Sequence, residues 1–312
     1  MKVLLTGGTG FVGSNLAVAI SQNGHFELTV VGRRKMEAGS DYVQMASCDG
    51  STNWRAALSG KNIVIHAAAR AHILKDNVLD PLAEYQQVNV EGTLNLALQA
   101  AAAGVKRFIF ISSIGVNGNI NTKPFTEDDE PNPTEPYAQS KWEAEQGLWT
   151  IQRETGLELV IVRPPLVYGP DAPGNFGGLM RWVRIGVPLP LGAIKNQRSL
   201  VALDNLVDLI TTCIVHPAAA NQVFLAGDGH DLSTTELLRG VARAMGRPSR
   251  LIPVPASFLM LGASLLGRKA MVQRLLGSLQ VDISKARDLL GWVPPITVEE
   301  GLRRCFVSQD KY

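Results

Sequence analysis

Short apolar runs alternate with amphipathic segments through the first half of this chain. The runs are rich in Val, Ile and Leu, and they predict strands over residues 2–7, 27–32, 42–46, 62–68, 107–113 and 158–164. Between them, patterns of helical period predict helices over residues 11–22, 82–103 and 137–154. Strands that are apolar along their whole length are buried on both faces, which is typical of a parallel sheet covered by helices on both sides. We therefore expect an α/β protein with a doubly wound parallel sheet.

The regular alternation of apolar runs and helical patterns ends after about Pro164. Proline and glycine become dense in the stretch RPPLVYGPDAPGNFGG, and the elements that follow it are shorter. This shift predicts a first domain over residues 1–165 and a smaller α/β domain over residues 166–312. Apolar segments near residues 199–226 have the pattern of elements that return to the first domain.

The overall charge does not indicate a polyanionic partner such as nucleic acid. The 312 residues carry a formal net charge of +2, whereas binding to nucleic acid depends on neutralising many phosphates, so we expect no nucleic-acid partner. The longest apolar run, residues 254–267, is shorter than the about 20 residues of a spanning helix, so we expect no transmembrane segment. A basic stretch follows this run, and contact of residues 254–274 with a membrane surface stays open.

The cysteines and the first residues indicate a reducing compartment. Cys48, Cys213 and Cys305 are far apart and have no paired spacing, which favours free thiols over a disulfide framework or a zinc site. The opening MKVLLTGGTG has the pattern of a strand and a turn rather than of a signal peptide. We expect a cytoplasmic protein without a bound metal.

Three glycines follow the first predicted strand and open the first predicted helix. Gly7, Gly10 and Gly13 stand in LLTGGTGFVGSNL with the spacing G-x-x-G-x-x-G. Glycine permits the tight turn, lets the backbone approach a pyrophosphate and allows close packing of helix on strand. The free N–H groups of the helix N-terminus add an anion-binding site. The motif predicts a Rossmann-like dinucleotide-binding domain at residues 1–165, which leaves residues 166–312 mainly for substrate.

The end of the second predicted strand bears on which dinucleotide binds. An acidic residue there would bind the ribose 2′-hydroxyl of NAD, but this chain has Arg33 and Arg34. Guanidinium groups suit a 2′-phosphate because they form bidentate, charge-assisted hydrogen bonds with it. The pair favours NADP(H), and NAD(H) stays open. Asp49, after the third strand, is interpreted either as an acceptor for the adenine amino group or as a capping residue.

A tyrosine and a lysine lie one helical turn apart in EPYAQSKWEAE. Tyr137 and Lys141 are neighbours on the predicted helix. A phenol with a pKa near 10 exchanges a proton with an alcohol near neutrality only if its anion is stabilised by about 4 kcal/mol. An ammonium about 4 Å away supplies about this much at an effective dielectric constant near 20, and it has to outweigh the desolvation of the phenol. Ser112 and Ser113, at the end of the strand RFIFISS, place hydroxyls at the edge where α/β sheets bind ligands.

These motifs together resemble the extended short-chain dehydrogenase/reductases of the NAD(P)-dependent nucleotide-sugar epimerase/dehydratase family. The similarity covers nearly the whole chain. It extends over TGGTGFVG, HAAA, VNVEGT, ISS, Tyr137-x-x-x-Lys141, RPPLVYGP, RSLVALDNLV and SKARDLLGWVPPITVEEGL. The resemblance implies an enzyme with a nucleotide-sugar substrate, and a homodimer formed through the helices near residues 82–103 and 137–154.

The resemblance also implies roles for individual residues. Tyr137 is the implied acid/base catalyst, Lys141 its partner, and Ser113 the hydroxyl at the catalytic Ser/Thr position. The implied cofactor contacts are Gly7, Gly10, Phe11, Val12, Gly13, Arg33, Arg34, Asp49, Ala67, Ala68, Ala69, Asn89, Ser112, Tyr137, Lys141 and Pro164. Besides Ser113, the implied substrate contacts are Arg198, toward the diphosphate, and Asn175.

Three chemistries share this scaffold. Family dehydratases carry an Asp-Glu pair directly after the catalytic Ser/Thr, and Ile114 and Gly115 in those positions cannot move a proton, which disfavours 4,6-dehydration. Because the arginine pair favours an exchangeable NADPH, our leading interpretation is reduction of a UDP- or dTDP-linked 4-keto-6-deoxy sugar, a UDP-N-acetyl sugar above all, for bacterial surface polysaccharide. The alternative is a UDP-hexose 4-epimerase, of the UDP-glucose or UDP-N-acetylglucosamine type, with tightly held NAD. A further alternative, a non-catalytic dinucleotide-binding sensor or interaction module, is disfavoured by the presence of both Tyr137 and Lys141.

Overall fold

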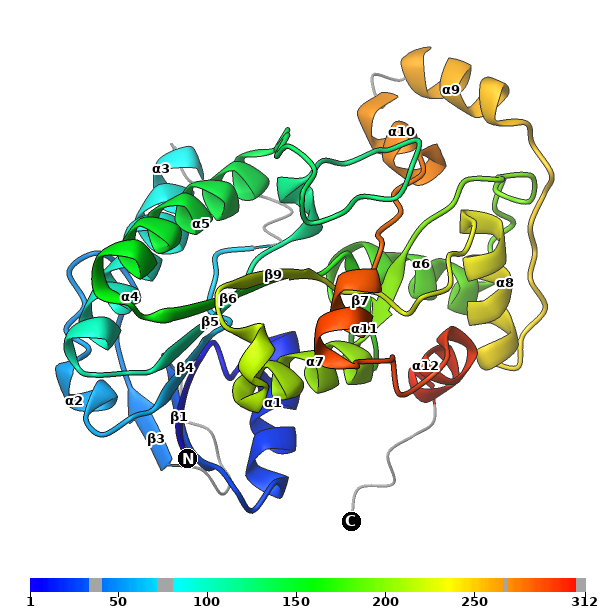
Figure 1. Cartoon of the computed structure of the whole chain (residues 1–312). Coiled ribbons are helices and arrows are strands. Elements are labelled where there is room, and N and C mark those ends of the chain that lie inside the picture. The colour runs from blue at the N-terminus through cyan, green and yellow to red at the C-terminus, as the bar shows by residue number, and fades with distance from the viewer. Residues whose placement is uncertain (34–40, 72–80, 266–268, 307–312) are drawn as a thin grey trace.

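A seven-stranded parallel sheet forms the centre of the molecule (Figure 1). The computed structural model describes residues 1–33, 41–71, 81–265 and 269–306. The strands lie in the order β3-β2-β1-β4-β5-β6-β9, and neighbours are parallel. Their bounds are β1 (Lys2–Thr6), β2 (Glu27–Gly32), β3 (Asp41–Gln44), β4 (Ile63–His66), β5 (Arg107–Ile111), β6 (Glu158–Arg163) and β9 (Gln222–Leu225). This architecture confirms the predicted α/β fold with a Rossmann-like sheet, in which the strand order reverses between β1 and β4.

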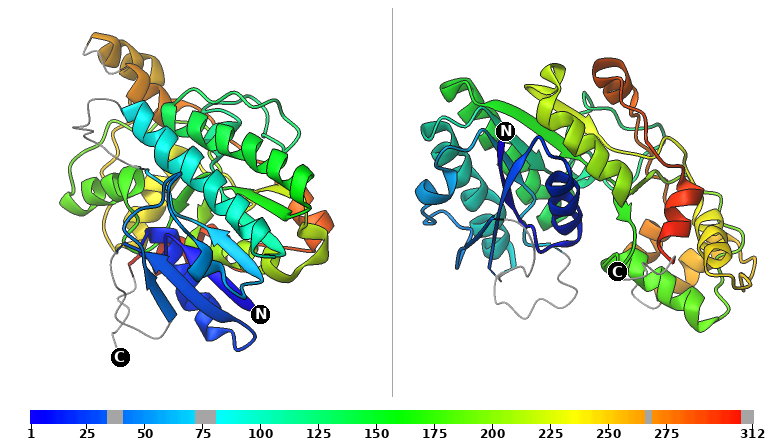
Figure 2. Two further views of the ribbon diagram at one scale, coloured as in Figure 1. Left: turned by 90° about the vertical axis from the view of Figure 1, so that its left-hand side faces the viewer. Right: turned by 90° about the horizontal axis from the view of Figure 1, so that it is seen from below.

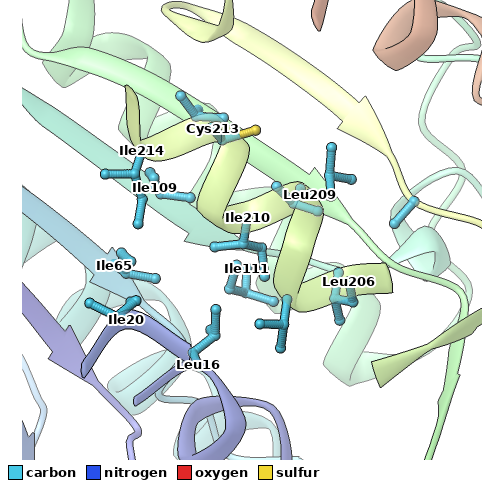
Figure 3. Close-up of a cluster of buried hydrophobic side chains, with 14 of the residues drawn as sticks. Leu16, Ile20, Ile65, Ile109, Ile111, Leu206, Leu209, Ile210, Cys213 and Ile214 are labelled. Atoms are coloured by element: carbon cyan, nitrogen blue, oxygen red, sulfur yellow. The ribbon is translucent and has the colours of Figure 1, made fainter. Parts of the chain in front are cut away.

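Helices cover both faces of the sheet, because successive strand residues point to opposite sides. The first layer consists of α1 (Phe11–Gln22), α7 (Leu203–Val215) and α11 (Ser284–Leu290), and the second of α2 (Arg55–Leu58), α4 (Gly92–Ala102) and α5 (Pro136–Thr155). Ile109 and Ile111 of β5 pack into the core beneath α1 and α7, as Figure 3 shows. Phe108 and Phe110 of the same strand belong to the core beneath α4 and α5. β5 is therefore buried on both faces, whereas the edge strand β3 is only partly buried.

The predicted continuous helix over residues 82–103 is interrupted. It consists of α3 (Pro81–Tyr85), a π-helical turn over Gln86–Glu91, and α4. The π-helical turn holds Asn89 in a buried position. A π turn inserts one extra residue per turn and is frequent at functional sites. Apolar periodicity does not reveal such an insertion, because the helix continues on both sides of it.

The remaining elements form a smaller group beside the sheet, seen from two further directions in Figure 2. They are β7 (Leu166–Tyr168), β8 (Leu200–Ala202), α6 (Gly174–Ile185), α8 (Thr234–Ala244), α9 (Ala256–Leu265), α10 (Lys269–Leu276) and α12 (Val298–Arg304). Of the elements expected to return to the main sheet, β9 pairs with β6, but β8 pairs with β7 in a separate two-stranded sheet. β8 has no place beside β6, because β5 and β9 occupy both of its edges.

No helix within these described ranges has both the length and the apolar character to cross a bilayer. Tyr168 and Phe176 lie at the centre of the smaller core, with their ring centroids 5.6 Å apart. This core joins α6, α8 and α12 to the two short strands.

Candidate active site

The glycine turn lies at the carboxyl end of β1, next to the first residues after β4. Gly7 has φ +74°, and a Cβ there would lie 2.5 Å from the amide nitrogen of Ala68. A Cβ at Gly13 would lie 2.1 Å from the carbonyl oxygen of Gly7. Side chains are therefore excluded at both positions. The turn closes with a hydrogen bond from Gly10 N–H to Gly7 C=O, and α1 begins directly after it.

This turn fits the pyrophosphate of a dinucleotide. Gly10 is the N-cap of α1, and the first turn of the helix carries no acidic side chain. Its N–H groups therefore present positive partial charge without a competing carboxylate. Phe11 and Val12 open the helix in half-buried positions, and Ala67, Ala68 and Ala69 leave β4 with small, half-buried side chains. The predicted contacts of the turn thus lie together at one edge of the sheet.

His66, at the end of β4, is a structural residue rather than a proton carrier. Its Nδ1 lies 2.7 Å from Thr6 Oγ1, and its Nε2 lies 2.9 Å from Thr93 Oγ1. Thr93 donates its own hydroxyl proton to Asn89 C=O, so Nε2–H of His66 is the donor in its pair. Burial lowers the pKa of His66 to about 3, and the nearby Lys141 adds to this effect. The ring is therefore neutral near pH 7.

Asn89 connects the segment after β4 to α5. Its side chain accepts from Arg70 N–H at 2.8 Å and donates to Arg70 C=O at 3.1 Å. It also donates to Ser140 Oγ at 3.0 Å, and Ser140 donates to Tyr137 C=O. The amide that the resemblance assigns to the cofactor therefore also fixes the backbone that would border the cofactor.

Lys141 is anchored beneath the end of β5. Its side chain is buried, and Nζ donates to Ile111 C=O at 2.9 Å. The same Nζ lies 4.4 Å from the centre of the Phe110 ring and 6.0 Å from the centre of the Tyr137 ring. α5 begins with Pro136 at its first turn, which presets the helical backbone just before Tyr137. The structure thus brings the tyrosine and the lysine together at the strand end.

Burial, rather than the ammonium, dominates the titration of this pair. It raises the pKa of Tyr137 to about 12, and the neighbouring Tyr85 adds to the rise. It lowers the pKa of Lys141 to about 7, although Glu145 acts in the opposite direction. Burial therefore acts against the phenolate and against the ammonium alike, and it is the larger effect on both pKa values in this structure.

The two adjacent serines have different environments. Ser113 is half-buried and caps the short helical turn Ile114–Val116, with its Oγ accepting from Gly115 N–H at 3.1 Å. Its hydroxyl proton therefore remains for donation. A Cβ on Gly115 would lie 3.1 Å from the Cβ of Ala138, so this turn packs against the helical turn that carries Tyr137. Ser112, expected at the cofactor, is buried and donates to Glu145 Oε1 at 2.5 Å.

Sequence reasoning missed the buried pair beneath these serines. Glu145 and Arg163 form an ion pair with both side chains buried, and Arg163 also donates to Asn117 Oδ1 at 3.0 Å. The position of Glu145, one helical turn after Lys141 on the same face, is the sequence signal that could have identified it.

The structure describes only some of the residues predicted to contact the adenine end of the dinucleotide. Arg33 is exposed at the end of β2, and Arg34 lies outside the described residues. Asp49 accepts hydrogen bonds from the backbone and hydroxyl of Ser51, which lower the pKa of Asp49. Asp49 therefore closes a local turn and does not cap a helix, because α2 begins at Arg55 with Trp54 as its N-cap. Pro164 is buried after β6, and its carbonyl accepts from Ile114 N–H.

An open cavity of about 620 Å³ lies between the segment that precedes α5 and α10. Its polar lining includes Asn117, Asn119, Asn121 and Glu135. Arg198 is half-buried and donates to Gly277 C=O at 3.2 Å, and burial lowers the pKa of its guanidinium.

The other residue expected at the substrate is Asn175. It lies in the first turn of α6, and its side chain is outside the described part of the structure.

Comparisons with known proteins agree with this arrangement. A family model described as "NAD dependent epimerase/dehydratase family" matches residues 3–227. The chain is 45% identical to a UDP-glucose 4-epimerase of Vibrio cholerae, over 97% of this chain and 94% of that protein. It is 30% identical to an N-acetyl-alpha-D-glucosaminyl-diphospho-ditrans,octacis-undecaprenol 4-epimerase of Escherichia coli O157:H7, over 97% of this chain and 93% of that protein.

A solved structure of similar shape supports the same relationship. The UDP-glucose 4-epimerase of Thermotoga maritima with UDP-glucose has a TM-score of 0.79 and 25% identity, and the similarity covers 98% of this chain and 97% of that chain. Together with the family match, these relatives confirm the resemblance that the motifs indicate. The protein is an enzyme of the extended short-chain dehydrogenase/reductase type, and its chain belongs to the NAD dependent epimerase/dehydratase family.

Proposed function

We propose that this protein is a UDP-hexose 4-epimerase, which inverts the hydroxyl-bearing C4 carbon of a nucleotide-linked hexose. The observation that carries the proposal is the anchored Tyr137 and Lys141 pair, in a chain 45% identical over nearly its full length to a UDP-glucose 4-epimerase. The reductase interpretation depends on the arginine pair, which bears on the choice of dinucleotide and does not distinguish a reductase from an epimerase. The epimerase alternative therefore replaces it as the leading function.

In this proposal Tyr137 moves the proton of the C4 hydroxyl. The phenolate accepts that proton as the alcohol becomes a ketone, and the phenol returns it when the opposite face is reduced. When bound, a nicotinamide dinucleotide supplies the hydride acceptor and donor. Lys141 in its protonated form favours the phenolate, and Ser113 donates its free hydroxyl proton to the C4 oxygen as negative charge develops there.

The binding roles divide between the two parts of the chain. Residues 1–165 hold the dinucleotide at the glycine turn, and residues 166–312 contribute most of the substrate site. Arg198 is the proposed contact for the diphosphate, since a half-buried guanidinium suits a bidentate phosphate interaction. The cavity of about 620 Å³ has the size of a small-molecule site, but neither Tyr137 nor Arg198 is among its lining residues, so we do not assign it to the sugar.

The cofactor is proposed to stay bound through the cycle, because an epimerase returns the hydride that it removed. The exposed Arg33 suits a ribose 2′-phosphate, so both NADP(H) and NAD(H) are candidates for the bound dinucleotide. Denaturing the purified protein and identifying the released dinucleotide by mass spectrometry decides between the two. We also propose a homodimer formed through the helices at residues 82–103 and 137–154.

The test of function uses purified protein without added cofactor. Proton NMR of UDP-glucose and UDP-N-acetylglucosamine should show the C4-inverted sugars accumulating to an equilibrium ratio. If neither sugar changes, and NADPH is instead consumed only with a UDP-linked 4-keto-6-deoxy sugar, the protein is a reductase. A diphospho-undecaprenol-linked N-acetylglucosamine forms a further arm, because the Escherichia coli relative is named for that substrate.

A further inference from the structure

Helix α9 presents an apolar stripe to solvent. Phe258, Leu261 and Leu265 are 64%, 61% and 81% exposed. Their spacing of three and four residues places them on one side of the helix. On the other side, Ala263 is buried and Leu259 packs against the smaller core. α9 lies at the upper edge of the molecule in Figure 1, and the exposed fractions of the three side chains show that the stripe faces solvent.

The chain around this helix has an unusual charge distribution. Between Glu236 and Asp282 it contains seven basic residues and no acidic residue. Residues 172–203 carry four more basic residues, again without an acidic one. The net charge of +2 is therefore the sum of basic and acidic residues that are concentrated in different parts of the sequence. A local cationic surface binds anions whatever the net charge of the whole protein.

Part of this positive charge gathers where the chain approaches α9. Arg247 donates to Arg184 C=O at 2.7 Å, and Arg250 donates to Gly186 C=O at 3.2 Å. These contacts place two arginines at the C-terminal end of α6, which carries the exposed Arg181 and Arg184 of its own.

Apolar side chains are exposed in the same region. Trp182 and Ile185 are 42% and 65% exposed on the last turns of α6. Ile252 is also exposed, in the segment between Arg250 and α9 that pairs with Leu189. Exposed basic and apolar side chains therefore occur together at the end of α6 and along the chain that leads from there to α9.

We propose that α9 and the C-terminal end of α6 dock the protein on the surface of a bilayer that contains anionic phospholipid. The apolar stripe enters the boundary between headgroups and acyl chains, and the arginines bind lipid phosphates. α9 has 10 residues, about 15 Å of helix, so it lies on the bilayer and does not cross it.

The charge of this surface favours a phospholipid bilayer over a second copy of the chain as its partner. A two-fold contact through the same face would enclose the arginine-rich surfaces of both copies in one interface. Like charges so placed repel, whereas a phospholipid surface supplies the opposite charge together with an apolar layer. The proposal does not depend on the substrate, so it stands apart from the proposed epimerase activity.

The test is sedimentation of the full-length protein with vesicles. The protein should bind vesicles of phosphatidylcholine and phosphatidylglycerol at least tenfold more strongly than vesicles of phosphatidylcholine alone. Because the Debye length falls from about 10 Å at 0.1 M salt to about 3 Å at 1 M, high salt should weaken the binding. The double variant Phe258→Gln/Leu261→Gln should bind at least tenfold more weakly than wild type, and Arg247→Gln/Arg250→Gln should lose the preference for the anionic vesicles.

A matched control replaces two exposed apolar side chains elsewhere, with Val18→Gln on α1 and Leu289→Gln on α11. This control should bind like wild type, and all variants should keep the wild-type circular dichroism spectrum. Absence of binding to the anionic vesicles overturns the proposal, as does equal binding by Phe258→Gln/Leu261→Gln. If light scattering shows that this variant instead dissociates a dimer, the face joins two copies and the proposal is wrong.

Discussion

Glu145 and Arg163 form a buried, two-contact ion pair beneath the candidate active site. Arg163 Nη2 lies 2.5 Å from Glu145 Oε2, and Arg163 Nε lies 3.0 Å from Glu145 Oε1. Ser112 donates to the same carboxylate, and Asn117 accepts from Arg163. The pair therefore joins α5, the end of β5, the end of β6 and the edge of the cavity. It fixes the backbone on which Ser113 and Lys141 depend.

Removing one charge of this pair should cost much stability. Glu145→Gln leaves the guanidinium of Arg163 buried without its counter-charge, and we expect a loss of about 3–5 kcal/mol in the free energy of unfolding. The control is Glu27→Gln at the exposed pair with Lys2, where we expect a loss below about 1 kcal/mol. Urea titration followed by circular dichroism measures both. Equal losses in the two variants would show that the buried pair does not hold the strand ends together.

Tyr137→Phe should greatly slow turnover while leaving the fold intact. The ring stays in place, but the proton-transferring hydroxyl is removed, so we expect the rate of C4 inversion to fall by about 10²–10⁴-fold. Tyr85→Phe is the matched control, because its ring contacts Tyr137 edge-on with centroids 6.2 Å apart. This second phenol has no assigned proton transfer, and its loss should change the rate far less. Activity retained in Tyr137→Phe would exclude the proposed acid/base role.

Gly13→Ala should disrupt the glycine turn. The added methyl would lie 2.1 Å from the Gly7 carbonyl oxygen, so the backbone has to shift. Overpacking of this kind costs about 1–3 kcal/mol, and we also expect the purified variant to release less dinucleotide on denaturation. Gly24→Ala serves as control, because a methyl there meets no atom within 4 Å. Thermal unfolding gives the stability, and wild-type behaviour of Gly13→Ala would contradict the close approach.

The central strands of the sheet can be predicted from the sequence, because a strand that is buried on both faces is a continuous run of apolar residues. The helix Phe11–Gln22 has the bounds that its periodicity predicts. The π turn at Asn89 is not readable, since it depends on contacts with Arg70 and Ser140 that are distant in sequence. β8 likewise has an ordinary strand pattern, and only the occupied edges of β6 decide that it pairs elsewhere.

In the candidate site, the motif spacing correctly predicts that Tyr137 and Lys141 lie on one helix. It does not predict the pKa of either side chain. Spacing alone indicated a phenol acidified by its neighbour. The pKa depends instead on how deeply both groups are buried, which is a property of the packed structure. Ser112 illustrates the same limit, because its partner Glu145 is 33 residues away in the sequence.

His66 should make the stability of the protein sensitive to acid. The folded pKa is about 3, whereas an unfolded histidine titrates near 6.5. Between these values the unfolded state binds one more proton, so the contribution of this group is fully present above pH 6.5 and is lost as the pH falls toward 3. The expected loss is several kcal/mol, at about 1.4 kcal/mol per pH unit. Urea titrations at pH 7, 6, 5 and 4 measure the slope.

The variant His66→Gln separates this contribution from that of the carboxylates. It loses hydrogen bonds with Thr6 and Thr93 and should be less stable at pH 7. Its stability should nevertheless fall less steeply with acid, because the side chain no longer takes up a proton on unfolding. His25→Gln, which changes an exposed imidazole, should keep the wild-type slope. Parallel slopes for wild type and His66→Gln would mean that the buried ring is not the source of the acid sensitivity.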